Sequence, residues 1–218
     1  MLDLQEEKKL VLNYFNDLDN AESDKLTEII SKYTSDDFHM RCTHPFNEIK
    51  GAENVAKNLW WPIKKSFNPI QRRMDIFYAG VNSHDKNQGR WVSSMGHLMG
   101  LFKKDFFGLK PNNKSVLLRY AEFYKIENNK ITEGAFFLDL MNFMQQLDLS
   151  IIPESTGFVC VTPGPMNHKG LKFNLSNKNE GEKTLELIHR MRDRLVEGSK
   201  MKSLKDELEL DWKKDMIW

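Results

Sequence analysis

Apolar residues recur at helical spacing through the N-terminal third of the chain. Three stripes comprise, in order, Leu10, Val11, Tyr14, Phe15 and Leu18; Leu26, Ile29, Ile30 and Tyr33; and Ala52, Val55, Ala56, Leu59, Trp60 and Ile63. Each stripe lies along one side of an α-helix, so the pattern predicts three amphipathic helices. Pro62 should end or kink the third helix, because proline cannot donate a backbone hydrogen bond.

From Arg72 onward the pattern changes to alternating apolar and polar positions. We expect strands over residues 74–81, 90–103, 114–126 and 131–138, and a shorter, earlier strand over 38–43. The long strands are joined mostly by short polar connections, which favour antiparallel pairing of neighbours. Helices followed by a sheet predict an α+β fold in which the helices pack in the concavity of a curved antiparallel sheet.

The last third of the chain has a different character. Turn-forming residues gather between positions 151 and 180 and indicate an extended, packed linker, which a helix over 182–196 follows. The chain then closes on residues 204–218, which include the apolar side chains of Trp212, Met216, Ile217 and Trp218. Burying one such side chain stabilises a protein by about 1.5–3 kcal/mol. We therefore expect this stretch to pack on the body, to pair with another copy, or to continue into a further domain.

Composition excludes several classes of function. The chain has 218 residues with 32 basic and 31 acidic side chains, so charge gives no case for nucleic acid as a partner. The two cysteines, Cys42 and Cys160, form no disulfide framework, and His39 and His44 have no third ligand at a metal-binding spacing. The N-terminus does not resemble a signal peptide, and no apolar run reaches the length of a membrane span. The expectation is a cytoplasmic protein without a metal.

Asp139 is the most informative candidate residue. It stands where the last predicted strand meets a helical pattern at Leu140, Phe143, Met144 and Leu147, and apolar residues flank it. Partial burial would raise the pKa of this carboxyl toward neutrality and suit it to proton exchange. The alternative is that Asp139 caps the following helix by accepting a backbone hydrogen bond. Both interpretations remain open at this point.

His97 is the second candidate for acid–base chemistry. Alternation places it on one face of its strand with Trp91, Ser93, Met95, Met99 and Leu101. In a pocket its imidazole could exchange protons or polarise a substrate carbonyl, because histidine titrates near neutral pH. The alternative is a core histidine that is hydrogen-bonded to the backbone.

Three further residues are candidates for substrate contact. Trp60 and Trp61 are successive residues about 100° apart around their helix. Trp60 belongs to the buried stripe, whereas Trp61 could stack on a planar substrate or pack under the linker. His44 precedes Pro45 and could line the mouth of a cavity or hold a turn.

The order and spacing of several short motifs resemble the SnoaL-like polyketide cyclase family over residues 36–148. The motifs are, in chain order, His44–Gly51, Trp60–Pro62, Gly96–Gly100, Leu109–Lys114, Tyr120–Ile126, Asn129–Ile131, Asp139 and Gln145–Leu147. The resemblance implies the cone-shaped α+β fold shared with nuclear transport factor two and scytalone dehydratase. The chain departs from the family at Pro111-Asn112-Asn113-Lys114, where the usual turn is Pro-Thr-Gly-Lys.

The resemblance also implies a chemistry. The acidic residue at the position of Asp139 acts in the cyclases as general acid and base in an intramolecular aldol closure, with no cofactor. Their pocket histidine has no counterpart here, since the strand before the last reads Phe123-Tyr124-Lys125. The predicted catalytic residues are Asp139 and His97. The predicted substrate contacts are His44, Trp60, Trp61, Met95, Tyr120 and Phe137.

We expect the ligand to be a small hydrophobic carbonyl compound and the protein to be a homodimer. The alternative is a non-catalytic ligand-binding or assembly domain of the same fold. Some larger relatives join two such domains through a Pro-Gly-Pro linker, which Thr162-Pro163-Gly164-Pro165 resembles. The predicted organisation is therefore a cone domain at 1–150, a linker and helix at 151–203, and the start of a truncated second domain at 204–218.

Overall fold

The computed structural model describes residues 4–82, 89–149, 164–165, 167–175 and 177–197, together with positions 153, 205 and 212. The chain divides into two compact units, of which the larger ends at Asn174 and the other begins at Leu175. The larger unit contains α1 (Gln5–Asn20), η1 (Ser23–Lys25), α2 (Leu26–Tyr33), β1 (Thr34–Cys42), β2 (Glu48–Lys50), α3 (Ala52–Val55), η2 (Ala56–Trp60), α4 (Trp61–Ser66), β3 (Phe67–Val81), β4 (Arg90–Phe102), β5 (Ser115–Glu127), β6 (Lys130–Leu138) and α5 (Leu140–Gln145). The other contains α6 (Lys178–Glu197).

The three helical stripes form as predicted. Val11, Tyr14, Phe15 and Leu18 of α1 are buried, as are Leu26, Ile30 and Tyr33 of α2. The third stripe is divided into α3, the π-helical turn η2 and α4, with Pro62 in the first turn of α4. A π-helical turn before a proline relieves the clash between its ring and the preceding turn. Pro62 therefore distorts this helix without ending it.

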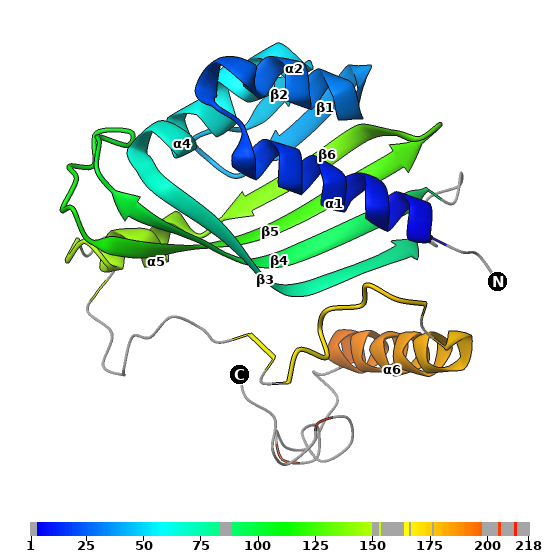
Figure 1. The fold of residues 1–218 in the computed structure, drawn as a ribbon. Helices are drawn as coiled ribbons and strands as arrows, with labels where there is room; N and C mark the ends of the chain where they lie inside the picture. Colours follow the sequence, from blue (N-terminus) through cyan, green and yellow to red (C-terminus); the bar gives the residue numbers. More distant parts are fainter. Residues whose placement is uncertain are drawn as a thin grey trace. The chain divides into compact units, whose positions relative to one another are not determined.

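Six strands form one curved sheet in the order β2-β1-β6-β5-β4-β3, and α1 crosses its concave side (Figure 1). All neighbouring strands are antiparallel except β1 and β6, which are parallel. The sheet is open, with helices on its concave face, as the cone fold requires. Strand β3 begins at Phe67, five residues before the predicted change of pattern, and carries Pro69. Proline is tolerated there because β3 is an edge strand.

Alternation along β5 defines the two faces of the sheet. Val116, Leu118, Tyr120, Glu122, Tyr124 and Ile126 are buried on the concave face, and the residues between them lie on the outer face. The register pairs Gly96 of β4 with Tyr120, and His97 with Arg119. Even-numbered positions in this part of β4 therefore face the helices, whereas His97 and Met95 belong to the outer face.

A segment near the end of the larger unit lies along the free edge of β3. Phe77 N donates to Gly170 O over 2.8 Å, and Lys172 N donates to Phe77 O over 2.7 Å. This pairing covers part of an edge that would otherwise expose backbone donors and acceptors.

The predictions for residues 204–218 lie outside the described residues, apart from positions 205 and 212. The domain boundaries predicted after residues 150 and 203 stay predictions. Among the described helices, none is long and apolar enough to cross a membrane.

Candidate functional site

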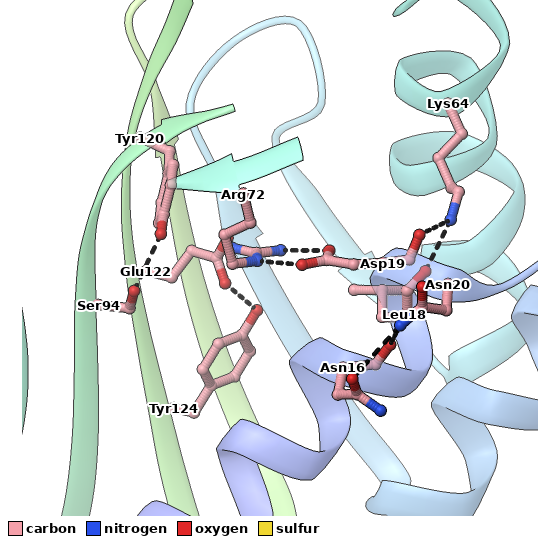
Figure 2. A network of polar contacts seen from close by, with 10 residues as sticks. All are labelled: Asn16, Leu18, Asp19, Asn20, Lys64, Arg72, Ser94, Tyr120, Glu122 and Tyr124. Atoms are coloured by element: carbon pink, nitrogen blue, oxygen red, sulfur yellow. Dashed lines mark hydrogen bonds and ion pairs between the residues drawn. The ribbon is translucent and has the colours of Figure 1, made fainter. Parts of the chain in front are cut away.

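A buried ion pair stands in the interior of the cone. Arg72 of β3 donates from Nη1 to Glu122 Oε1 over 2.6 Å, and from Nε to Asp19 Oδ2 over 2.9 Å (Figure 2). The Glu122 side chain is completely buried and that of Arg72 is 3% exposed. Tyr124 donates its hydroxyl to Glu122 Oε2 over 2.7 Å. Carboxylates from α1 and β5 thus meet at one guanidinium of β3.

Burial and neighbouring charges change the pKa values of the groups in this cluster. Burial raises the pKa of Glu122 above its ordinary value of 4.5, although Arg72 and Tyr124 act in the opposite direction. Burial also raises the pKa of Tyr14 and Tyr124, and the Glu122 charge adds to both effects. The two phenols therefore stay protonated over the physiological range. Glu122 is a buried carboxyl that accepts hydrogen bonds from a cation and from a phenol.

Aromatic rings enclose the Arg72 guanidinium. Its central carbon lies 4.2 Å from the ring centroid of Phe15, 5.1 Å from that of Tyr120 and 5.6 Å from that of Trp60. Trp60 packs in turn on Phe136, with centroids 5.5 Å apart. A cation over aromatic faces is stabilised electrostatically, and more so when water is excluded. The interior is therefore apolar in its walls and ionic at its centre.

One side of the cluster reaches a surface cleft. Asp19, whose side chain is 30% exposed, lines a cleft of about 400 Å³ together with Lys64, Phe67, Pro69 and Ile70, among others. Lys64 Nζ donates to the carbonyl oxygens of Leu18 and Asp19 at the end of α1 (Figure 2). Asp19 is thus the outermost member of the buried network and its connection to solvent.

The architecture agrees with the sequence comparison. The family model described as SnoaL-like polyketide cyclase matches residues 16–147, more than half of the chain. The chain belongs to the SnoaL-like polyketide cyclase family. A search of curated proteins found no match.

Several solved structures share the fold. AclR, a proposed hydroxylase from Streptomyces galilaeus, is 18% identical, with a TM-score of 0.53 over 67% of this chain and 98% of that one. A proposed SnoaL-like polyketide cyclase from Jannaschia sp. CCS1 is 17% identical, with a TM-score of 0.51 over 69% and 95%. A proposed polyketide cyclase from Xanthomonas campestris pv. campestris is 15% identical, with a TM-score of 0.50 over 66% and 97%. At these identities the likeness concerns the fold alone.

Two of the predicted substrate contacts belong to the interior of this SnoaL-like cone. Trp60 is 2% exposed and Tyr120 is 1% exposed, and both rings contact the Arg72 guanidinium. The Tyr120 hydroxyl lies 3.1 Å from Ser94 Oγ. Burial raises the pKa of Tyr120 to about 12, while Arg72 acts to lower it.

Asp139 stands at the N-terminus of α5 as its cap. Its Oδ1 accepts a hydrogen bond from Asn142 N over 2.9 Å, and its own backbone N donates to Arg119 O. This is the geometry of the helix-cap interpretation. The side chain is partly exposed. Among the described hydrogen bonds and ion pairs, none joins Asp139 to Arg72 or Glu122.

The remaining predicted residues lie away from the interior. His97 and Met95 are on the outer face, where His97 Nδ1 lies 3.2 Å from Asp75 Oδ2. Phe137 also faces outward and is 49% exposed. His44 is exposed in the turn after β1, and Trp61 is 41% exposed beneath Lys65. The predicted site residues therefore do not form one site: some lie inside the cone, some on the outer face of the sheet and some elsewhere on the surface.

Sequence reasoning missed the residues at the centre of the cone. On the buried face of β5, Glu122 is an acidic residue among apolar and aromatic ones. This pattern is the signal in the sequence that could have identified it. Arg72 stood at the boundary between helical and strand patterns, where neither face could be assigned. Asp19 lies beyond the last apolar position of the α1 stripe. Within the described part of the chain, His, Cys, Asp and Glu side chains do not gather into a possible metal site.

Proposed function

We propose that the interior of the cone binds a small hydrophobic carbonyl compound and that Glu122 exchanges a proton with it, using protein side chains alone. The observation that carries this proposal is the Glu122 carboxyl, fully buried between the Arg72 guanidinium and the Tyr124 hydroxyl. Burial raises the pKa of this carboxyl, and buried carboxyls with a shifted pKa are candidates for acid–base catalysis.

The network supplies the groups that such a reaction needs. Asp19 accepts from Arg72 Nε and Nη2 at the side of the cleft. A carbonyl oxygen that takes the place of the Asp19 carboxylate would accept the same two hydrogen bonds. Glu122 could then remove a proton from the adjacent carbon, and Arg72 would stabilise the negative charge that develops on the oxygen. The aromatic walls formed by Phe15, Trp60 and Tyr120 suit an apolar ligand.

The test is proton exchange at the carbon next to a carbonyl group. The protein is incubated in D₂O with a panel of cyclic aromatic ketones and 1,3-diketones, and loss of the α-proton signal is followed by NMR. We expect Glu122→Gln to slow protein-dependent exchange by about 100-fold or more, as loss of a general base does. Glu133→Gln, which changes a partly exposed acid of β6 paired with Arg41 of β1, serves as the control.

Asp139→Asn separates the two candidate acids. If Asp139→Asn abolishes exchange and Glu122→Gln does not, Asp139 is the acid–base residue and Glu122 is structural. If ligands bind without any exchange in the unmodified protein, the domain is a non-catalytic binding module. The packing of Trp60 on Phe136 beside the Arg72 guanidinium favours the other non-catalytic alternative, an assembly domain whose interior is filled by side chains.

We also propose that the protein is a homodimer that associates through the outer face of the sheet. Phe137 and Tyr78 are 49% and 45% exposed, and Phe137 packs edge to face on Phe123 with centroids 6.1 Å apart. Exposed aromatic residues of this size favour association. Light scattering should give twice the monomer mass, and Phe137→Lys should give the monomer. A monomer in the unmodified protein would refute the proposal.

A further inference from the structure

A surface cleft of about 610 Å³ lies beside the helical segment that runs from α3 to α4. The turn between β1 and β2, strand β2 and the connection between β4 and β5 contribute its other lining residues. Its volume is in the range of small-molecule pockets. Among the described residues that line it, none belongs to the Arg72–Glu122 cluster, so the cleft is separate from the ion pair inside the cone.

Exposed aromatic rings line this cleft. Trp61 of α4 is 41% exposed, and Phe107, in the connection between β4 and β5, is 55% exposed. The buried ring of Phe46 also lines the cleft and packs edge to face on Phe107, with centroids 5.3 Å apart. Lys65 Nζ lies over the Trp61 ring, 4.4 Å from its centroid. The cleft therefore offers aromatic surface from two separate elements to a ligand.

Phe107 has an unfavourable backbone conformation. Phe106 and Leu109 exchange backbone hydrogen bonds of 3.1 and 3.0 Å across a two-residue turn, in which Phe107 has a φ of 51° and Gly108 a φ of 85°. A turn with positive φ at both central residues favours Asn-Gly, and positive φ is rare for a bulky side chain. Burial alone gives no reason for a phenylalanine here, because the residue is more exposed than buried. Backbone strain of this kind is concentrated at functional sites.

Two ammonium groups lie at the same cleft. Lys50 of β2 and Lys57 of the helical segment line it, and both residues are exposed. Across the residues that the structure describes, no ion pair includes Lys50 or Lys57. Glu48 is the acidic lining residue, and its Oε2 lies 3.2 Å from His39 Nε2. The lining thus carries two lysines and one carboxylate, which favours a ligand with a single negative group.

We propose that this cleft binds an aromatic monocarboxylate, at a site separate from the interior of the cone. The ring of the ligand contacts Trp61 and Phe107, because aromatic rings attract one another beyond the burial of their area. Its carboxylate accepts a charge-assisted hydrogen bond from Lys57 Nζ, four residues before Trp61 on the helical segment, and Lys50 adds a second positive charge. An aliphatic acid lacks the first contact and a neutral aromatic compound lacks the second, so both features are needed for full affinity.

NMR of the indole N–H groups tests the site directly. The chain has five tryptophans, and Trp61→Phe and Trp60→Phe assign the two signals that matter. The protein is titrated at neutral pH with 2-naphthoate, with the neutral compound 2-naphthalenemethanol, and with cyclohexanecarboxylate, which has no aromatic ring. We expect 2-naphthoate to shift the Trp61 signal along a saturable curve, and each of the other compounds to bind about tenfold more weakly.

Two outcomes of this titration would overturn the proposal. One is an absent or unsaturable shift of the Trp61 signal, or an affinity for either of the other compounds that equals the affinity for 2-naphthoate. The other is a saturable shift of the buried Trp60 signal without a shift of Trp61, which would place the ligand inside the cone.

Two variants localise the binding. Lys57→Gln should weaken 2-naphthoate binding by about tenfold and leave the affinity for 2-naphthalenemethanol within about twofold, since only the charge-assisted contact is lost. Lys9→Gln, at an exposed lysine of α1 outside the cleft, is the matched control and should leave both affinities within about twofold. Phe107→Asn should fold, because asparagine adopts positive φ readily, and should weaken both aromatic compounds by about tenfold. Unchanged 2-naphthoate affinity in Lys57→Gln or in Phe107→Asn would contradict the assignment.

Discussion

Arg72 and Glu122 are 50 residues apart in the chain, and their side chains meet at 2.6 Å inside the cone. Both are buried, and a second carboxylate from Asp19 and the hydroxyl of Tyr124 complete the cluster. Taking charges out of water is expensive, and the pair is tolerable because almost every polar atom in it is bonded. This arrangement makes the interior of the domain both a candidate site and a point of structural vulnerability.

Removal of one partner of the pair should be severe. Arg72→Met leaves Glu122 buried without its cation, and we expect a loss of about 3–5 kcal/mol in the free energy of unfolding. Urea denaturation followed by tryptophan fluorescence measures it. In the double variant Arg72→Met/Glu122→Leu, apolar side chains replace both charges, and most of the loss should be recovered.

Arg41→Met is the matched control for this experiment. Arg41 Nη1 contacts Glu133 Oε2, also at 2.6 Å, but the two side chains are 49% and 31% exposed. Arg41→Met should lower the free energy of unfolding by less than about 1 kcal/mol because water screens the pair. Equal costs for Arg72→Met and Arg41→Met would show that burial of the interior pair has no energetic consequence.

The protonation of Glu122 should contribute to the pH dependence of the protein's stability. Burial raises the pKa of this carboxyl in the folded protein above the ordinary value of 4.5. The folded state then binds more protons than the unfolded state, so the contribution of Glu122 to stability falls as pH rises from 4.5 through the folded pKa. Glu122→Gln should remove this decline from urea midpoints measured across the acid and neutral range.

Glu133 gives the opposite sign and serves as the comparison. Its hydrogen bond with Arg41 lowers its pKa below 4.5, so its contribution is present above 4.5 and is lost as pH falls through the folded pKa. Glu133→Gln should therefore reduce the loss of stability on acidification. A wild-type profile that matches Glu122→Gln throughout would contradict the role given to Glu122.

Substitutions at Asp139 measure its value as a helix cap. Asp139→Ala removes the acceptor of the Asn142 N–H and should cost about 1 kcal/mol, whereas Asp139→Asn should be nearly neutral because asparagine caps equally well. Chemical denaturation reports both. Asp36→Ala, at an exposed position of β1, is the control and should change stability by less than about 0.5 kcal/mol. A loss in Asp139→Asn as large as in Asp139→Ala would mean that charge, and not capping, stabilises this site.

Gly96 should be intolerant of any side chain. A Cβ there would approach Arg73 O to 2.0 Å, and this neighbour is backbone that can move only if β3 and β4 separate. We expect Gly96→Ala to cost about 3 kcal/mol. Gly80→Ala, in the same strand pair with open space around it, should be neutral or slightly stabilising. Thermal unfolding of the two variants checks the contrast, and similar melting temperatures would refute it.

The thiol of Cys42 should react slowly in the folded protein. Burial, with a smaller effect of Glu122, raises its pKa to about 12. Since the thiolate is the reactive form, alkylation by iodoacetamide should be much slower at this residue than in the urea-unfolded chain. Peptide mapping by mass spectrometry measures both rates. Equal rates would show that the thiol is accessible and ionises normally.

Local periodicity located most of the regular elements of the larger unit, but not the short strand β2 or the start of β3. The stripe from Leu10 to Leu18 predicted α1, and the alternation from residue 114 to residue 126 predicted β5. A helix and a strand impose their periods on neighbouring residues of the same segment, so these patterns can be read without knowledge of the partners. The motif spacing likewise indicated the family and its cone fold, which the family match confirms.

Only the tertiary structure decided which face of each strand points inward. The face that contains Met95 and His97 was predicted as a group, but the sheet turns it outward and gives the concavity to Tyr120, Glu122 and Tyr124. Alternation defines two faces and does not say which of them the helices cover when both carry apolar residues. The parallel pairing of β1 with β6 is decided in the same way, by strand order and not by local sequence.

The contacts between distant residues are the part that the sequence left open. Arg72 of β3 and Glu122 of β5 lie on either side of β4. Their side chains meet because the three strands curve around α1. Asp75 reaches His97 because one extra residue in β3 shifts the register by a single position. Register and sheet order depend on the packing of the whole domain, so neither pair could be recognised from spacing along the chain.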